Sequence, residues 1–355
     1  MKKLIVALAI ISSFYATAQL TDVVTSGLVA PFDVVIEGND AFIVEFQGNT
    51  ISRIDITDAN PTLENVVTGI ASPTTLLFDN DDVYIAQVNG LITRREASDL
   101  TSNQTTIASG LTTPVSLVRS GDFLYFSEFQ GARIGRINLA NNNTVETVIA
   151  GLNFPEQMAL IDDQLYITIS GSGSIGRINI NDANPQLEII TTGLNTPAGI
   201  VASGDTIFVT EFVTNGSIFN INTADANPVA TELVNGLDNP FGIALGDDAL
   251  FVVQNGSNRL SRYDGDLLNI TDINQINDLS IYPNPSTGSF QISGLENITV
   301  ASATIYDITG KKVQSITPQS ILENNINVAG LTRGTYILTI VSFEQNILNH
   351  KIIIQ

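Results

Sequence analysis

The chain has 355 residues, of which 43% are hydrophobic and 14% are charged, a composition typical of a globular protein and unlike that of a disordered one. Its formal net charge is −21, and this becomes −23 when the two lysines at positions 2 and 3 are left out. A protein this acidic repels phosphate backbones and anionic membranes, which excludes nucleic-acid binding. Cysteine is absent, so stability must come from a large core and not from disulfides.

The first 18 residues have the pattern of a signal peptide. Two lysines precede an apolar run from Leu4 to Tyr15, and Ala16-Thr17-Ala18 supplies the small residues that a signal peptidase accepts. We expect the mature chain to begin near Gln19. No later segment approaches the roughly 20 apolar residues of a membrane-spanning helix. The sequence therefore predicts an exported protein that is not integral to a membrane.

A five-residue pattern of the form GLxxP returns six times between residues 27 and 240. The intervals of 41 to 43 residues are typical of a propeller, a solenoid or another repeat array. The third copy contains four short apolar segments, at 114–118, 123–129, 132–138 and 144–150, and its hairpin turn is rich in glycine and aspartate. Four antiparallel strands in about 42 residues predict one propeller blade. The copies begin at Gly27, Gly69, Gly110, Gly151, Gly193 and Gly236.

Residues 19–264 are therefore predicted to form a six-bladed β-propeller. The sixth copy lacks its fourth strand after Asp264, but a similar segment, LTDVVTSG, stands before the first copy. We expect this N-terminal strand to complete the last blade and close the ring. Each GLxxP segment then links two blades, because glycine permits the turn and proline suits the first residue of a strand.

The order of proline, apolar strand, hairpin, apolar strand, acidic residue and arginine strand resembles the NHL-type and gluconolactonase-like six-bladed propellers over residues 19 to about 266. This resemblance implies the fold more strongly than any activity, because propellers serve many functions. It also implies that a calcium-dependent lactonase or related hydrolase is an alternative to a binding module.

Residues 265–278 are predicted to be a linker, and residues 279–355 a small antiparallel β-sandwich. Their motifs resemble the type A C-terminal sorting domain of the type IX secretion system. The resemblance implies a secreted or surface-attached protein of a member of the Bacteroidota, with the secretion machinery and its sorting peptidase as partners. The residues that carry it are Tyr282, Pro283, Asn284, Pro285, Gly288, Tyr306, Asp307, Gly310, Lys311, Gly334, Tyr336 and Lys351.

Eighteen residues after each repeat glycine the chain places mostly Glu or Gln, and a following strand carries arginine in five copies. The acids could converge as a metal or acid/base set, but we interpret them as cross-strand ion pairs with the arginines. The first column is Glu45, Gln87, Glu128, Ile169, Glu211 and Gln254. The arginines are Arg53, Arg94, Arg136, Arg177 and Arg262.

The preferred ligand site lies six residues after each repeat glycine, on the predicted inner strands. These residues vary while their neighbours stay apolar, and variation within a rigid repeat is where function is usually placed. The alternative is simple solvation of a wide channel. Phe32 and Phe241 flank this position and offer a stacking surface. The candidate residues are Asp33, Thr75, Ser116 and Gln157, with glycine in the last two copies.

Catalysis by a Ser-His-Asp or Cys-His set is excluded in the propeller, because the chain has no cysteine and its only histidine, His350, lies in the tail. The same absence disfavours a mechanism like that of virginiamycin lyase. A calcium site needs six to eight oxygens, and the inner strands offer only Asp33, with Glu156 as a further weak candidate. The sequence therefore predicts a secreted binding module for a glycan, peptide or protein, without a required cofactor.

Overall fold

The computed structural model describes residues 19–246, 249–264, 280–293, 300–307, 312–317, 320–321, 326–342 and 347–355. Contacts divide the chain into two compact units, Met1–Leu267 and Leu268–Gln355. The predicted signal peptide at 1–18 and the predicted linker at 265–278 lie outside the described residues. Apart from the short 3-10 helix η1 (Ser170–Ser172) and residues 320–321, the regular structure described is all β.

The described part of the first unit contains six antiparallel sheets of four strands each. Five of them are continuous in sequence. These are β2 (Pro31–Glu37), β3 (Asp40–Glu45), β4 (Thr50–Asp55) and β5 (Glu64–Thr68); β6 (Pro73–Asp79), β7 (Asp82–Gln87), β8 (Leu91–Glu96) and β9 (Thr105–Ala108); β10 (Pro114–Ser120), β11 (Phe123–Glu128), β12 (Arg133–Asn138) and β13 (Thr144–Ala150); β14 (Pro155–Ile161), β15 (Gln164–Ile169), β16 (Ser174–Asn179) and β17 (Glu188–Thr192); β18 (Pro197–Ser203), β19 (Thr206–Glu211), β20 (Thr214–Asn222) and β21 (Thr231–Asp238).

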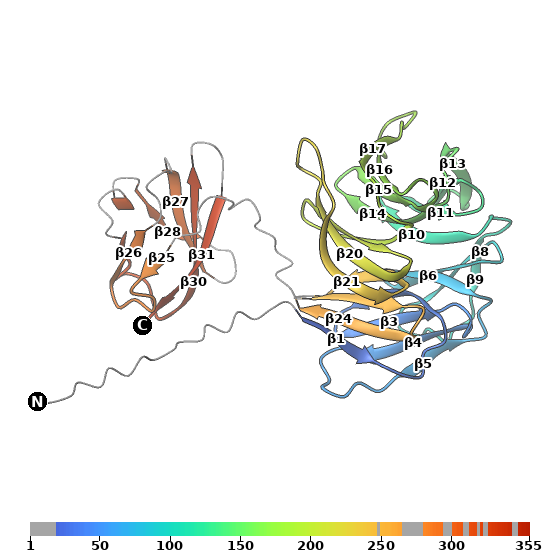
Figure 1. Ribbon diagram of the computed structural model, residues 1–355, viewed down its shortest axis with the longest axis horizontal. Helices are drawn as coiled ribbons and strands as arrows, with labels where there is room; N and C mark the ends of the chain where they lie inside the picture. The colour runs from blue at the N-terminus through green and yellow to red at the C-terminus, as the bar shows by residue number, and fades with distance from the viewer. Residues whose placement is uncertain are drawn as a thin grey trace, which may run out of the picture. The chain divides into compact units, whose positions relative to one another are not determined.

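The sixth sheet joins segments from the two ends of the unit. Its strands β22 (Pro240–Leu245), β23 (Leu250–Gln254) and β24 (Arg259–Asp264) are consecutive, and β1 (Gln19–Val24) is its fourth strand. β1 pairs antiparallel with β24, with Gln19 opposite Asp264 and Thr21 opposite Arg262. In Figure 1 the blue strand β1 accordingly lies beside the orange strand β24.

In each sheet of the first unit, one strand begins at the proline of a GLxxP segment; we call these the first strands, and they are β2, β6, β10, β14, β18 and β22. This position suits proline, which has no N–H to donate to a neighbouring strand. The repeat glycine has a positive φ in all six copies, from 71° to 94°, as the predicted turn requires. The first strands of consecutive sheets pack against one another, and β22 also packs against β2.

The core of the unit lies between neighbouring sheets. Phe42, Val44 and Ile85 belong to one buried cluster shared by the first two sheets, and Tyr84 and Phe126 belong to the next cluster. Alternation along a strand sends successive side chains to opposite faces. Because each sheet is covered on both faces, the second strands read as nearly continuous apolar runs, as in β11 (FLYFSE).

The described part of the tail unit contains two antiparallel sheets. Its core joins both of them through Phe290, Ile305, Leu338 and Ile352, which is the packing of a small sandwich. One sheet contains β25 (Ser280–Tyr282), β26 (Ser289–Ser293) and β29 (Ile326–Asn327), and the other β27 (Val300–Asp307), β28 (Lys312–Ile316), β30 (Gly334–Ser342) and β31 (Ile347–Ile354).

Candidate functional site

The linkers between sheets are fixed by a hydrogen bond that recurs six times. The residue before each proline has a positive φ of 45° to 56°, which is uncommon for a residue with a side chain. Its carbonyl accepts from the N–H of the residue that follows a second strand, at 3.0 to 3.1 Å. The pairs, acceptor first, are Ala30 with Phe46, Ser72 with Val88, Thr113 with Phe129, Phe154 with Ser170, Thr196 with Phe212 and Asn239 with Asn255.

The Glu and Gln column also holds these linkers. Glu45 Oε2 accepts from Val29 N at 2.6 Å, and Glu211 Oε1 accepts from Asn195 N at 2.6 Å. Gln254 Oε1 accepts from Asp238 N at 2.8 Å, while Glu128 accepts from Thr112 N. These side chains therefore do not converge on a ligand but bind the backbone of the incoming linker.

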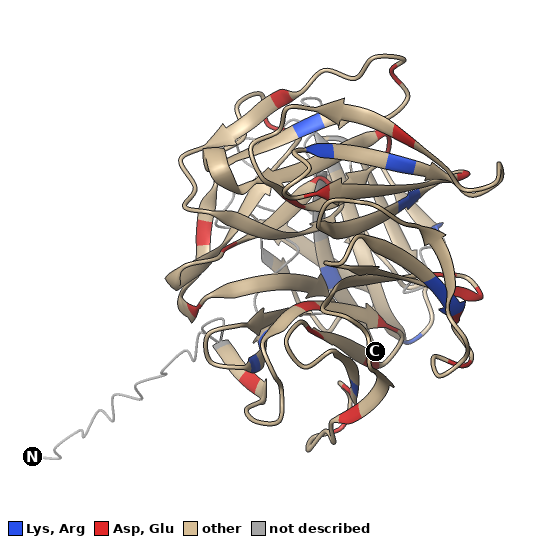
Figure 2. Cartoon of the chain, turned by 90° about the vertical axis from the view of Figure 1, so that its right-hand side faces the viewer, with Lys and Arg blue, Asp and Glu red and all other residues tan. Residues whose placement is uncertain are grey.

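The predicted ion pairs between this column and the arginine column are wrong. Glu45 lies opposite Thr50 in the β3–β4 register, while Arg53 lies opposite Phe42. Three of the arginines instead pair with glutamates on the fourth strands β5, β13 and β17, and two pair with aspartates at the start of β7 and the end of β24. Figure 2 shows basic and acidic positions on neighbouring strands. The pairs are Arg53 with Glu64, Arg94 with Asp82, Arg136 with Glu146, Arg177 with Glu188 and Arg262 with Asp264, at 2.5 to 3.3 Å.

A cavity of about 500 Å³ lies where the linkers meet the ends of the second strands. Pockets of this size hold small organic ligands. Its apolar wall contains six phenylalanines. Two stand in the strands β2 and β22, three directly follow second strands, and one lies in a linker. They are Phe32, Phe46, Phe129, Phe154, Phe212 and Phe241.

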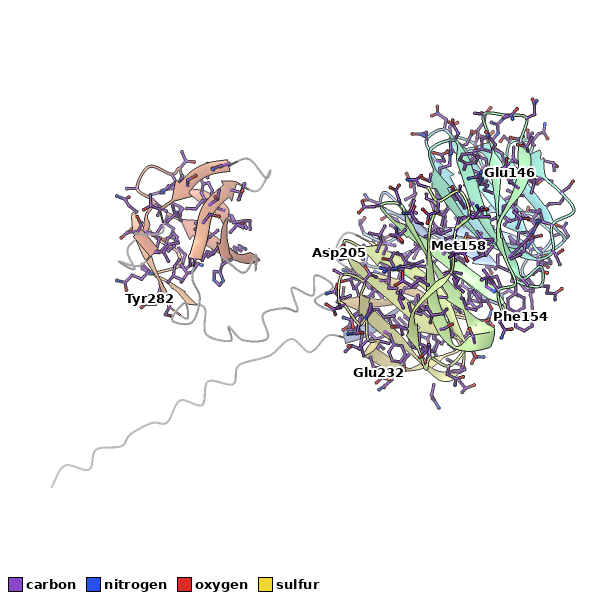
Figure 3. The ribbon with its side chains drawn as sticks, turned by 90° about the horizontal axis from the view of Figure 1, so that it is seen from above. Glu146, Phe154, Met158, Asp205, Glu232 and Tyr282 are labelled. Atoms are coloured by element: carbon purple, nitrogen blue, oxygen red, sulfur yellow. The ribbon has the colours of Figure 1, made fainter. Side chains whose placement is uncertain are left out.

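The phenyl rings form two contacting groups. Phe32 stacks on Phe241 with 3.8 Å between ring centroids, and it also contacts Phe46 at 5.5 Å. Phe212 meets Phe241 edge to face at 5.1 Å. Phe154 stacks on Phe129 at 4.9 Å and is 45% exposed, at the surface of the unit (Figure 3). The rings meet at interplanar angles from 28° to 74°, so they cannot all present the same aspect to a ligand.

Glu156 is the one ionisable side chain among the residues described as lining this cavity. It stands at the second position of β14, is only 6% exposed, and accepts from Ser170 Oγ at 3.2 Å. Burial in apolar surroundings raises the pKa of Glu156 to about 8, against the opposing effect of the Ser170 hydrogen bond. At neutral pH the cavity therefore holds a carboxylic acid in its uncharged form.

Three of the predicted ligand-binding residues, Asp33, Thr75 and Gln157, are brought together, and all three are buried. Gln157 Nε2 donates to Asp33 Oδ1 at 2.9 Å, and Val34 N donates to the same oxygen at 2.9 Å. Burial raises the pKa of Asp33 to about 6, against the opposing hydrogen bonds of Thr75, Gln157 and Val34. These residues stand one position further along the inner strands than the cavity residues Phe32, Thr74 and Glu156.

Among the described residues, the cavity lining includes Phe32 and Phe241 but none of the four predicted polar residues. Asp33 has its hydrogen bonds within the protein, and Ser116 Oγ accepts from Met158 N at 3.1 Å. Met158 is buried inside the unit (Figure 3). Phe46, Phe129, Phe154 and Phe212 were not predicted from the sequence. Three of them directly follow the Glu and Gln column, and an apolar residue just after a strand end was the available signal.

The donor set does not fit the calcium ion that the resemblance implied. Calcium takes six to eight oxygen ligands, usually with several carboxylates. The described residues contain no grouping of three histidine, cysteine, aspartate or glutamate side chains that could hold a metal. Asp33 is hydrogen-bonded to Gln157 and Glu156 to Ser170, so the two weak metal candidates have separate partners.

The tail brings several predicted sorting residues into contact. Asn284 Nδ2 donates to the Lys351 carbonyl at 2.9 Å, and its Oδ1 accepts from Ile353 N at 2.8 Å. Asp307 lies opposite Tyr336 in the β27–β30 register. The segment around Tyr282 to Pro285 is thereby fixed to the last strand. Gly310 and Lys311 lie outside the described residues.

Residues 280–355 match the family model of the secretion system C-terminal sorting domain. This confirms the sorting domain predicted from the sequence. Among the described residues, no helix has the length and apolar character needed to cross a membrane.

The chain is similar in structure to three solved β-propellers. A gluconolactonase from Xanthomonas campestris is 12% identical, with 70% of this chain and 89% of that chain covered and a TM-score of 0.57. A catalytically inactive virginiamycin B lyase from Staphylococcus aureus with quinupristin is 20% identical, with 78% and 97% covered and a TM-score of 0.52. The calcium-binding protein regucalcin from Agrobacterium tumefaciens is 11% identical, with 69% and 94% covered and a TM-score of 0.53.

These likenesses confirm the predicted resemblance to gluconolactonase-like propellers, and at such low identities they concern the fold alone. No curated protein sequence matches the chain.

Proposed function

We propose that the protein is a secreted or surface-attached binding module that holds a small organic ligand in the phenylalanine-lined cavity. The observation that carries the proposal is the cavity itself, whose lining combines six phenyl rings with one buried carboxyl group, that of Glu156. Six aromatic side chains around one cavity would leave an apolar surface in water, and a bound ligand would cover it.

The architecture that we propose is a closed six-bladed propeller over residues 19–264, with the six four-stranded sheets as blades and β1 as the closing strand. Its support is the pairing of β1 with β24 and the packing of β22 against β2. A closed ring holds the linkers rigidly in place, so the cavity they line is formed before the ligand arrives.

For export we propose a signal peptide at 1–18, a linker at 265–278 and a sorting domain at 279–355 that passes the protein to the type IX secretion machinery. The match of residues 280–355 supports this route. A sorting peptidase would then act within the linker and leave the propeller outside the cell, attached or released.

The binding proposal is tested with N-phenyl-1-naphthylamine, a neutral aromatic probe whose fluorescence rises in apolar sites. We expect one saturable site on the purified chain. Phe154→Ala should weaken binding about 5-fold to 30-fold, because a ring contact is typically worth about 1–2 kcal/mol.

The matched control is Val229→Ala, which shortens a side chain that is 68% exposed and is not among the cavity residues. It should bind the probe as the parent does. Equal binding by Phe154→Ala and the parent, or many weak sites on both, would remove the cavity as the binding site.

A further inference from the structure

We infer that the cavity selects organic cations, such as quaternary ammonium compounds or apolar amines, over neutral and anionic molecules of the same shape. The inference rests on the proposed function and specifies its ligand class. It draws on the ring arrangement, on the charges around the cavity and on the position of Glu156.

The rings supply the first argument. The face of a phenyl ring carries partial negative charge, so cations bind over it and anions are repelled. Phe46, Phe32, Phe241 and Phe212 form a continuous series of ring contacts, in which neighbouring rings meet at 30°, 29° and 74°. Rings at such different angles offer a cation more than one face within a single cavity.

The charges supply the second argument. No lysine or arginine is among the described lining residues, so an anion would find no partner. The chain as a whole carries a formal net charge of −21. An acidic protein attracts cations and speeds their encounter with the site.

The third argument is the carboxyl group of Glu156, which has no cationic partner among the residues that the structure describes. The charged groups on the elements packed against β14 are engaged elsewhere. Arg119 of β10 pairs with Asp79 at 2.8 Å, and Glu128 of β11 pairs with Arg133. β18 and η1 carry no titratable side chain. The other titratable groups on these elements are Tyr125 of β11 and Tyr166 of β15, and Asp33 of β2 accepts a hydrogen bond from Gln157 of β14.

An organic cation would supply the missing partner. In the empty cavity the carboxyl group of Glu156 keeps its proton because burial disfavours the charged form. A cation bound beside it favours the carboxylate, so binding at neutral pH releases that proton to solvent. Ser170 Oγ can continue to donate to the carboxylate and hold its orientation.

The test compares three probes of nearly the same shape: choline with its positive charge, neutral 3,3-dimethylbutan-1-ol and anionic 3,3-dimethylbutanoate. Their affinities for the full chain are measured by displacement of N-phenyl-1-naphthylamine between pH 6 and 9. At pH 9 we expect choline to bind at least tenfold more tightly than the alcohol, and the acid not to bind. Below pH 8 the choline affinity should fall about tenfold per pH unit, because one proton must leave.

Glu156→Gln should abolish the pH dependence of choline binding and reduce the preference for choline at pH 9, with circular dichroism confirming the fold. Val229→Ala should retain both. An alcohol that binds as tightly as choline, or a pH dependence that survives in Glu156→Gln, would overturn the inference. If N-phenyl-1-naphthylamine binds at the site but choline shows no advantage, only the cation selectivity fails. If no probe binds, the proposed function fails with it.

Discussion

Gln157 Nε2 donates a hydrogen bond to Asp33 Oδ1 at 2.9 Å although the two residues are 124 positions apart. They lie on β14 and β2, the first strands of the fourth and first sheets. In the order in which the first strands pack against one another, two other first strands separate β14 from β2 in either direction. The bond therefore joins two first strands that are not neighbours in this order. Gly242 makes room for it, since a Cβ there would lie 2.3 Å from Asp33 Oδ1.

Replacing Gln157 tests this contact. Gln157→Ala removes the donor to a buried carboxyl group, so we expect the free energy of unfolding in urea to fall by about 1–3 kcal/mol. Gln47→Ala, at an exposed glutamine, should change it by less than about 0.5 kcal/mol. Equal effects of the two substitutions would show that the bond across the interior contributes nothing.

Stability should depend on pH through Glu156. Its pKa is raised to about 8 in the folded protein from an ordinary 4.5, so the folded state holds this proton more tightly than the unfolded state. The stability this carboxyl group contributes is fully present below about pH 4.5 and is lost as the pH rises to about 8. Glu156→Gln cannot ionise, so its stability relative to the parent should grow by roughly 1.4 kcal/mol per pH unit within this window. Urea unfolding at one-unit steps measures the difference, and a constant difference would contradict the assignment.

Asp33 gives a related and separable effect. Its pKa is raised to about 6 from an ordinary 3.8, so its contribution is lost between about pH 4 and pH 6. The free energy of unfolding of Asp33→Asn should therefore rise relative to that of the parent only between about pH 4 and pH 6. Urea unfolding of Asp33→Asn and Glu156→Gln at pH 4, 6 and 8 distinguishes the two carboxyl groups. A further rise in the relative stability of Asp33→Asn above pH 6 would contradict the prediction.

The linker contacts predict which substitutions the Glu and Gln column accepts. Gln254 already serves the sixth sheet by accepting from Asp238 N and donating to Ser261 Oγ at 2.7 Å. Glu45→Gln can make the same two bonds with Val29 N and Ser52 Oγ, so it should cost less than about 0.5 kcal/mol. Glu45→Leu leaves both groups without this acceptor and should cost about 1–3 kcal/mol. Thermal and urea unfolding measure the stabilities of Glu45→Gln and Glu45→Leu. Equal losses of stability would show that the hydrogen bond from the linker backbone to residue 45 contributes nothing.

Much of the fold could be predicted because its repeat is local in sequence. Proline marks the start of each first strand, and in the third copy the predicted strands end within two residues of β10, β11, β12 and β13. Turn and strand signals of this kind act over a few residues. Ion pairs were harder to predict, because the pairing register between neighbouring strands decides which charged residues lie opposite one another. The acid opposite Arg53 is Glu64 on the next strand, and Glu45 is not its partner.

The cavity could not be predicted for a different reason. The β2–β3 pairing shifts by one residue between Pro31 and Asp33. Similar shifts follow the first proline of the other five sheets. A shift of one position exchanges the residues that face the interior, so Phe32 lines the cavity and Asp33 does not. Alternation of polar and apolar letters carries no sign of such a bulge. Phe154 reaches the cavity from a linker, where no periodicity applies.

Calcium should have little effect on the protein. The described donors near the cavity offer one carboxyl group, and a ligand that binds only the folded state must raise its thermal midpoint. We expect the midpoint of the first unfolding transition to stay within about 1 °C when calcium is replaced by chelator. A clear rise with calcium would bring back the calcium-dependent lactonase alternative, and lactone turnover would be assayed next.

Deleting residues 279–355 should block export. The matched domain at 280–355 carries the sorting signal, and the first unit has a separate core. The truncated protein should therefore fold and remain in the periplasm, where cell fractionation would detect it. A milder variant, Asn284→Ala, removes the side chain that holds Lys351 and Ile353 and should reduce secretion in part. Normal secretion of the truncated protein would exclude this route.

The strand β1 pairs with residues about 240 positions later, as the Thr21 to Arg262 contact shows. A strand whose backbone N–H and C=O groups are still unpaired can pair with another chain before it pairs with its own partner. Contacts of such long range also form late, because the loop they close must be ordered first. The segment Gln19–Val24 is thus synthesised before β24 and should be among the last strands to pair. Aggregation during folding would accordingly depend on how soon β1 pairs with β24. A separate peptide with the β1 sequence should compete with β1 for pairing with β24.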